Sequence, residues 1–300
     1  MHSMKQACSG WQPVERPQRP VLFVNPLSGG GKATRAAVAD RARERGVEAI
    51  VLTQDQSLAA LIRDAVARGA DALGVAGGDG SLAIVAESAQ AHSLPFVCIP
   101  TGTRNHFARD LGVDLDDPVG ALDAFTEGVE RRIDLGEVNG HVFLNNVSLG
   151  IYGNAVRRRG YRGAKVRTIL DTTAEVLGPG APVQELQLAD DLGREHRHPA
   201  VVLVSNNPYA LDRPLVPGTR STLDSGRLGI IVLETLRWRP DPPPRSWSAT
   251  AVQVTAPAPV HAGVDGEAVD LMPPLEFLAR PAALRVRISR RHPGTPHGTV

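Results

Sequence analysis

Val75-Ala76-Gly77-Gly78-Asp79-Gly80-Ser81 is the stretch that decides the fold class of this 300-residue chain. It lies where a short apolar run, 73–76, gives way to a second run with helical spacing that begins at Leu82. Glycines at such a strand-to-helix junction allow positive φ angles and a close approach of the backbone to a ligand. The start of a helix offers unpaired N–H groups and the positive end of its dipole, which favour phosphate.

Asp79 adds a carboxylate to this glycine loop, and a carboxylate repels a bare phosphate. Its presence is explained by a divalent cation that bridges the two, or by a hydroxyl that must be oriented for phosphoryl transfer. The loop therefore indicates nucleotide chemistry.

Two familiar glycine motifs do not account for the chain. Residues 78–83 match the dinucleotide pattern G-x-G-x-x-A, but residues 96–103, about 20 positions further on, contain no acid for a ribose. Gly29-Gly30-Gly31-Lys32 resembles part of a Walker P-loop, whose spacing requires a glycine at Pro26 and a Ser or Thr at Ala33. Neither standard motif is present.

Apolar runs and helical patterns alternate from Val21 to about Arg109. The alternation predicts a parallel, doubly wound sheet, with its ligand site at the carboxyl ends of the strands. The expected strands are 21–24, 49–52, 73–76 and 96–99, and the expected helices are 33–45, 58–68 and 82–91. Polar loops follow the strands at Asn25-Pro26-Leu27-Ser28-Gly29, Thr53, Gly77–Ser81 and Pro100-Thr101-Gly102-Thr103-Arg104-Asn105. We expect these four loops to converge on one site.

From about Arg132 the rhythm changes to short β-rich runs separated by turn residues, which predicts an antiparallel sheet forming a β-sandwich. The runs are 142–149, 183–188, 200–205, 228–233, 251–255 and 284–288, with a helical interruption near 154–177. The fold class is therefore α/β in two domains. We place a disordered or strapping tail at 1–19, an α/β nucleotide-binding domain at 20–131, a β-sandwich substrate domain at 132–290 and a flexible tail at 291–300.

Composition describes an ordinary globular chain, with 42% hydrophobic and 22% charged residues. A net charge of +1 provides no electrostatic reason to bind nucleic acid. Cys98 lies in an apolar run and Cys8 in a polar one, without metal or disulfide spacing, so a reducing cytoplasm is the simplest compartment. The first twenty residues contain no apolar signal core, and no uncharged run approaches the ~18 residues of a membrane span. We expect the protein to reach a membrane only from its surface.

The loops 25–29, 77–81 and 100–105, together with Asp265-Gly266-Glu267, resemble the diacylglycerol kinase catalytic family. That family includes bacterial lipid kinases, sphingosine kinases and ceramide kinases, with NAD kinases as distant relatives. The resemblance covers roughly residues 21–288, with the motifs in family order. It implies a nucleotide-binding α/β domain and a β-sandwich domain, an active site in the cleft between them, and the use of ATP and Mg²⁺.

The resemblance also implies a role for each motif. The ATP-binding residues would be Asn25, Pro26, Ser28, Gly29, Thr53, Gly77, Gly78, Gly80, Ser81, Thr103, Arg104 and Asn105. Asp79 would lie near the transferred phosphoryl group and Mg²⁺, and either Asp265 or Glu267 would accept the proton of the substrate hydroxyl. The shorter Asp265 is the more rigid candidate base, Glu267 has a similar claim, and the sequence leaves the choice open. Such a division suits phosphoryl transfer, which depends on positioning and charge neutralisation.

Three positions depart from the family pattern. Arg104 stands where glycine is usual, and His106 stands where aspartate is usual, which removes a carboxylate from the phosphate region. The run Leu223-Asp224-Ser225-Gly226 resembles the family's structural Mg²⁺ loop, but Ser225 takes the aspartate position and Asp224 stands one place early. We therefore do not expect the second metal to bind normally, and Asp224 is a doubtful ligand.

Several features have a plain structural explanation beside the functional one. Asp265-Gly266 is also a strong hairpin-turn signal, and both readings are compatible. The basic residues between 157 and 167 suit a solvated helix face or an anionic membrane surface, and Trp238 and Trp247 suit core packing or an interfacial anchor.

These observations predict an ATP-dependent, Mg²⁺-requiring lipid kinase that phosphorylates a hydroxyl of diacylglycerol or a related lipid, in phospholipid metabolism. We expect a cytoplasmic protein in peripheral contact with membranes, with no nucleic-acid partner; the lipid and the oligomeric state, a homodimer included, stay open. One alternative is an NAD-kinase-like enzyme with a soluble acceptor. Another is a nucleotide-binding regulatory relative weakened by His106 and Ser225.

Overall fold

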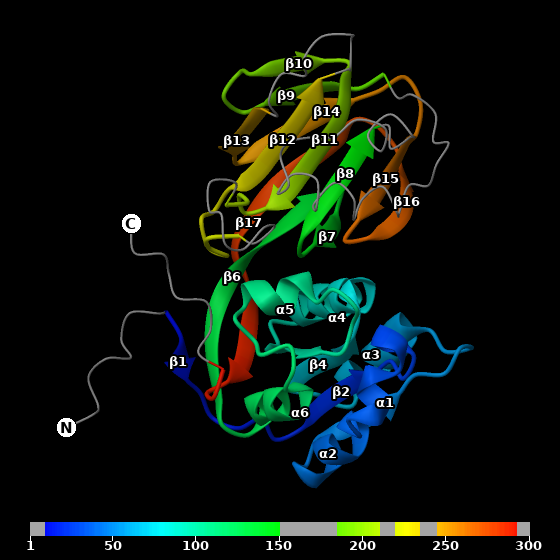
Figure 1. Ribbon diagram of the computed structural model, residues 1–300, viewed down its shortest axis with the longest axis vertical. Coiled ribbons are helices and arrows are strands. Elements are labelled where there is room, and N and C mark those ends of the chain that lie inside the picture. The colour runs from blue at the N-terminus through cyan, green and yellow to red at the C-terminus, as the bar shows by residue number, and fades with distance from the viewer. Residues whose placement is uncertain (1–9, 151–184, 211–219, 235–244, 293–300) are drawn as a thin grey trace, which may run out of the picture. The chain divides into compact units, whose positions relative to one another are not determined.

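The computed structural model describes residues 10–150, 185–210, 220–234 and 245–292 (Figure 1). The chain divides into a first unit, Met1–Ile133 with Ala282–Val300, and a second unit, Asp134–Pro281. Strands β6 (Gly128–Val138) and β17 (Leu275–Ser289) run from one unit into the other. The predicted sandwich boundary at residue 290 therefore lies beyond the end of the second unit, because the last part of β17 pairs within the first.

The first unit contains a parallel sheet in the order β3-β2-β4-β5-β17. Its strands besides β17 are β2 (Pro20–Val24), β3 (Glu48–Val51), β4 (Ala72–Gly77) and β5 (Phe96–Pro100). Every residue of β2, β4 and β5 is buried. Central parallel strands are covered on both faces, which explains why these three read as continuous apolar runs rather than alternating ones.

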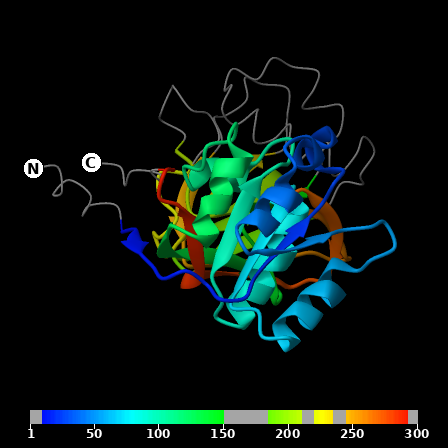
Figure 2. The same cartoon turned by 90° about the horizontal axis from the view of Figure 1, so that it is seen from below.

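Helices cover both faces of this sheet (Figure 2). Helix α2 (Val38–Glu44) packs with α6 (Pro118–Ala121), and α3 (Leu58–Ala67) packs with α4 (Asp79–Ala91). The expected helix 33–45 is divided into α1 (Lys32–Arg35) and α2, because Ala37 between them has a left-handed φ of 49°. The remaining short elements are η1 (Ser28–Gly30), α5 (His106–Asp110) and η2 (Leu122–Phe125).

Both ends of the described chain pack on the first unit. Strand β1 (Gln12–Pro13) pairs antiparallel with β6, and the guanidinium of Arg131 lies 5.0 Å from the centre of the Trp11 ring. This part of the N-terminal segment is a strap rather than a disordered tail. His292 is only 5% exposed and its Nε2 lies 3.9 Å from a carboxylate oxygen of Asp117, so the predicted flexible tail does not begin at 291.

The second unit contains an antiparallel sheet in the order β13-β12-β11-β8-β15-β16. These strands are β8 (Asn146–Gly150), β11 (Pro199–Asn206), β12 (Leu228–Glu234), β13 (Arg245–Ala249), β15 (Val260–Val264) and β16 (Glu267–Leu271). A second layer has the order β10-β9-β14-β17, with β7 (His141–Phe143) paired to β6. Its other strands are β9 (Gln187–Asp190), β10 (Glu195–Arg197) and β14 (Ala251–Thr255).

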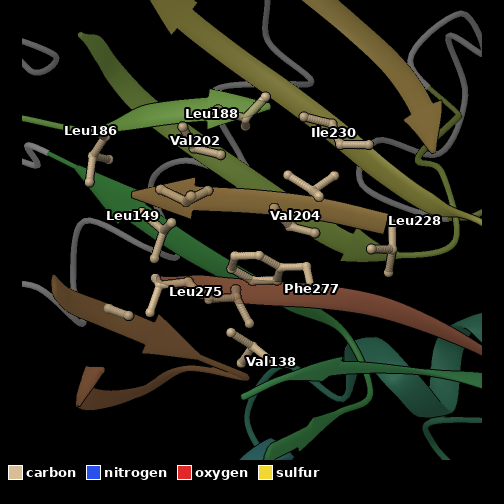
Figure 3. Close-up of a cluster of buried hydrophobic side chains, with 14 of the residues drawn as sticks. Val138, Leu149, Leu186, Leu188, Val202, Val204, Leu228, Ile230, Leu275 and Phe277 are labelled. Atoms are coloured by element: carbon tan, nitrogen blue, oxygen red, sulfur yellow. The ribbon is translucent and has the colours of Figure 1, made fainter. Parts of the chain in front are cut away.

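Apolar side chains from both layers meet in one core, which includes Leu149, Val202, Leu228, Leu275 and Phe277 (Figure 3). Along β14, Val252 and Val254 point into this core and the residues between and after them are exposed, the alternation that stacked antiparallel sheets favour. The predicted fold class, a parallel α/β domain followed by an antiparallel sandwich, is confirmed.

Trp247 packs against the core of the second unit and its Nε1 donates to Asp190 Oδ2 at 2.8 Å, which favours the packing role over the membrane anchor. Trp238, the basic residues of 157–167 and the expected helix near 154–177 lie outside the described residues. In the described ranges, no helix combines the length and the apolar character that crossing a membrane requires.

Candidate active site

The four predicted loops lie at one edge of the sheet of the first unit. Asn25, Thr53, Gly77 and Thr101 stand at or just after the carboxyl ends of β2, β3, β4 and β5, which are parallel neighbours. Parallel strands bring these ends to the same edge, where open α/β sheets bind their ligands.

Glycines allow three of the loops to touch. A Cβ added to Gly29 would lie 2.3 Å from the carbonyl oxygen of Thr101, and one added to Gly102 would lie 2.9 Å from Gly78 Cα. Both positions are closer than real Cβ atoms approach other atoms, so only glycine permits these contacts. The backbones of loops 28–30, 77–78 and 101–102 therefore form one continuous surface, which we call the glycine cradle.

The glycines of the cradle serve two different needs. Gly29 and Gly30 have positive φ angles of 56° and 65°, which favour glycine. Gly77, Gly78 and Gly80 are not among the residues with positive φ, so the expectation of positive φ in that loop is wrong. Gly102 is required by its close approach to Gly78, whereas a Cβ added to Gly78 itself would meet only Ser28 Oγ, at 3.7 Å.

Helix α4 starts at Asp79, three residues before the expected start, with Gly78 as its N-cap. Gly78 has no side chain that could cap the first N–H groups of this 13-residue helix, and the start of a helix suits a phosphate. Asp79 and Ser81 are half-buried in the first turn. Burial, and to a smaller extent the negative charge of Asp79, raise the pKa of the Cys98 thiol well above its usual value.

Two buried polar atoms beside the cradle lack a hydrogen-bond partner in the described structure. They are Thr101 Oγ1 and Asn105 Oδ1, on residues that are 0% and 5% exposed. Asn105 has a left-handed φ of 50° and its Nδ2 donates to Gly102 O at 2.9 Å, which fixes the amide in place. Unsatisfied buried polar atoms are costly, and they are typical of a site that a ligand completes. The residues present therefore fit a bound nucleotide.

The remaining predicted nucleotide residues belong to the same loops at this edge of the sheet. Asn25 Oδ1 accepts from Leu27 N at 3.0 Å and shapes the first loop. Thr53 and Thr103 are exposed, and Arg104 is half-buried. Thr101 was missed as a site residue by sequence reasoning, although its place between a strand end and Gly102 was visible.

The second unit carries the predicted acidic motif on a hairpin. Asp265 and Gly266 form the two-residue turn between β15 and β16, with φ angles of 48° and 93°. Two successive positive φ angles are typical of a type I′ turn, so the hairpin interpretation of this pair holds.

The two candidate bases have different surroundings. Asp265 is 5% exposed, and its carboxylate accepts from the backbone N–H groups of Leu144 at 2.7 Å, Asn145 at 2.7 Å and Asn146 at 3.1 Å. These bonds fasten the turn between β7 and β8 to the hairpin. Glu267 is exposed at the first position of β16. Asp265 is thus engaged by the backbone, whereas the Glu267 side chain is exposed to solvent.

The loop at residues 223–226, which resembles the family's structural Mg²⁺ loop, does not form a cluster of acidic side chains. Asp224 is exposed, and its carboxylate accepts from the Thr222 hydroxyl. Across the described ranges, no group of three or more His, Cys, Asp or Glu side chains is placed to bind a metal ion. The residues of this loop do not fit the family's structural Mg²⁺ site.

The site residues thus form two sets. The cradle and Asp79 belong to the first unit, and Asp265, Glu267 and Asp224 belong to the second. Four further residues of the second unit, buried near Asp265, were not anticipated from the sequence: Asp134, Asn206, Asn207 and Arg220. The pair Asn206-Asn207 at the end of an apolar strand was the one visible signal.

The sequence of this chain is similar to that of known proteins of one family. Residues 19–138 match the model of the diacylglycerol kinase catalytic domain. A Pseudomonas fluorescens protein described as a probable YegS-like lipid kinase is 30% identical over 263 residues, covering 78% of this chain and 82% of that protein. A Mycobacterium tuberculosis diacylglycerol kinase is 36% identical over 120 residues, a match that spans only 39% of either chain.

The fold has a solved counterpart. The crystal structure of a diacylglycerol kinase from Bacillus anthracis superposes with a TM-score of 0.65 over 93% of this chain and 100% of the other. At 16% identity this likeness supports the fold alone.

Proposed function

Because this chain belongs to the diacylglycerol kinase catalytic domain family, we propose that it is an ATP-dependent kinase of diacylglycerol or a related lipid. It transfers the γ-phosphoryl group of ATP to a lipid hydroxyl at a membrane surface. The observation that carries the proposal is the glycine cradle, in which three loops meet with no room for a side chain at Gly29 or Gly102.

The first unit supplies the nucleotide side of the reaction. The cradle and the first turn of α4 present backbone N–H groups, which suit the phosphates of ATP. Asp79, in that first turn, and phosphate oxygens would hold Mg²⁺. When bound, the ion neutralises charge on the transferred group.

The second unit supplies the acceptor side. We assign the general base to Glu267, because Asp265 already accepts three backbone hydrogen bonds and Glu267 is exposed. The carboxylate of Glu267 takes the proton of the lipid hydroxyl as that oxygen bonds to the γ-phosphorus. The bond from the γ-phosphorus to its bridging oxygen breaks, and ADP leaves.

The test is transfer of label from [γ-³²P]ATP to a total lipid extract in mixed micelles with Mg²⁺. Asp79→Asn is the site variant, and Asp116→Asn is the matched control, since Asp116 is exposed and lies outside the cradle loops. We expect a labelled lipid with the wild type and with Asp116→Asn, and its loss with Asp79→Asn. The mobility of the labelled product identifies the acceptor.

Two outcomes would contradict the proposal. Transfer to a water-soluble acceptor, independent of detergent or vesicles, would instead support an NAD-kinase-like enzyme. ATP binding without transfer to any lipid, with Mg²⁺ or Mn²⁺, would support a regulatory relative.

A further inference from the structure

The loop at residues 220–226, which precedes β12, is closed by hydrogen bonds to buried groups of other segments. Ser225 stands where the resemblance led us to expect a metal-binding aspartate. Its Oγ donates to Asn207 Oδ1 at 2.5 Å, and its backbone N–H donates to the same oxygen at 2.8 Å. Asn207 is fully buried. One buried amide oxygen therefore engages both donors of Ser225.

A buried carboxylate engages the next residue of the loop. The Gly226 N–H donates to Asp134 Oδ2 at 2.6 Å, and the Asp134 N–H donates to Leu223 O at 2.8 Å. Asp134 is 2% exposed. Its backbone and its side chain thus bind both sides of the turn, and this carboxylate oxygen faces a peptide N–H.

Arg220 brings a permanent positive charge to the start of the loop. It is 2% exposed, and its guanidinium donates to Leu144 O at 2.5 Å, Asn206 O at 2.8 Å and Asn145 Oδ1 at 3.2 Å. Carbonyl and amide oxygens are ligands that a hard divalent cation also prefers. Here these three oxygens already receive the guanidinium donors, and arginine keeps its charge at all relevant pH values.

Asn206 joins the two parts into one network. Its Nδ2 donates to Asp134 O at 2.9 Å and to Leu144 O at 3.2 Å, and its Oδ1 accepts from Asn207 Nδ2 at 3.2 Å. Buried polar networks of this kind fix a single conformation when their members are satisfied.

We propose that Asp134, Asn206, Asn207, Arg220 and Ser225 form a lock that closes loop 220–226 without a divalent cation. The oxygens that could bind a metal ion already accept hydrogen bonds within the lock. Arg220 supplies the positive charge that a metal ion would bring. Within the described residues, the Mg²⁺ of the proposed reaction then belongs to the nucleotide site and not to loop 220–226. Closure of loop 220–226 by the lock depends neither on the identity of the lipid acceptor nor on turnover.

The lock also reaches the turn that supports the acidic hairpin. Leu144 and Asn145 accept from Arg220 and donate their backbone N–H groups to the Asp265 carboxylate. The Asp265–Gly266 turn is therefore linked to Arg220 through hydrogen bonds between protein groups.

The first test is thermal unfolding of the Asp79→Asn protein without nucleotide, in millimolar MgCl₂ and in EDTA. The substitution removes the carboxylate of the nucleotide site, so any remaining response to Mg²⁺ reports on other sites. We expect the two midpoints to agree within about 1 °C. A midpoint several degrees higher in MgCl₂ would overturn the lock.

The second test removes one bond of the lock. Ser225→Ala deletes the hydroxyl that donates to Asn207, and Ser246→Ala is the matched control at an exposed position of β13. We expect Ser225→Ala to lower the midpoint by about 2–4 °C in MgCl₂ and in EDTA alike, with no change for the control. Equal midpoints for the two variants, or a loss seen only in EDTA, would contradict the proposal.

Discussion

The two units hold their candidate site residues in place by different means. In the first unit, backbone atoms meet at Gly29 and Gly102, which leave no space for a side chain. In the second unit, buried polar side chains, among them Arg220 and Asp265, bind the backbone of other segments. A site built from backbone can be recognised as glycine motifs, whereas a site built from side chains depends on partners that only the fold brings together.

Sequence distance shows the same difference. The Asp265 carboxylate accepts from Leu144, which is 121 positions away, and Arg220 donates to Leu144 O across 76 positions. The cradle loops, in contrast, each follow a recognisable strand of one βα rhythm. A local pattern is therefore sufficient to find the cradle and insufficient to find the lock.

The largest expected effect separates the two acids of the hairpin. Glu267→Gln should lower the rate of phosphoryl transfer about 10³-fold, because it removes the general base, with unchanged unfolding. Asp265→Asn should instead lower the free energy of unfolding by about 2 kcal/mol, because the amide NH₂ cannot accept a backbone N–H. Transfer assays and urea denaturation measure the two effects.

Glu276→Gln provides the control for this comparison, since Glu276 is an exposed glutamate of β17 in the same unit. It should change neither property. If the Asp265→Asn protein folded stably and lost transfer as completely as Glu267→Gln, the assignment of Glu267 alone as the general base would be wrong.

A smaller effect should distinguish crowding from backbone angle in the cradle. Gly29→Ala places a Cβ 2.3 Å from Thr101 O, whereas the equivalent Cβ at Gly30 meets nothing within 4 Å, and both glycines have positive φ. We expect Gly29→Ala to weaken ATP binding about 10- to 100-fold more than Gly30→Ala, since overpacking costs about 1–3 kcal/mol. Calorimetric titration with ATP measures this, and equal affinities would show that the loops do not need their close contact.

The lock predicts a loss of stability of about 2 kcal/mol for Arg220→Met, because the guanidinium donors to buried oxygens disappear. The loss stays moderate because Leu144 O also accepts from Asn206. Arg280→Met is the control: this half-exposed arginine pairs with Glu137 at the surface and should contribute less than about 1 kcal/mol. Denaturant unfolding that gave the two variants equal stability would remove the distinction between buried and exposed arginines.

The smallest expected effect concerns the thiol behind the cradle. Because burial raises the pKa of Cys98, the thiolate fraction stays low at mildly alkaline pH and alkylation of the native protein should be slow. In a Cys8→Ser background, Asp79→Asn should increase the rate only slightly, since burial is the larger cause. Mass spectrometry after iodoacetamide treatment measures the rate. Alkylation as fast as in urea would show that Cys98 is not buried in solution.

Secondary structure was predictable where a run of apolar residues, or a run with helical spacing, corresponds to a single strand or helix. The buried strands β2, β4 and β5 and the helix α3 lie close to their expected bounds. The break in the expected helix 33–45 was not predicted, because alanine at position 37 gives no sign of a left-handed φ. Strand β17 was predicted only in its last part, since its first residues pair in the second unit and its last in the first.

The sequence by itself determined the βα rhythm, the sandwich and the glycine loops, because hydrophobic period and backbone freedom are properties of neighbouring residues. The tertiary structure alone decided the roles of Asp265, Arg220 and Ser225, because a carboxylate, a guanidinium or a hydroxyl acquires its role from the partner it faces. For Asp265 that partner is the backbone of residues 144–146, and for Ser225 it is the amide of Asn207.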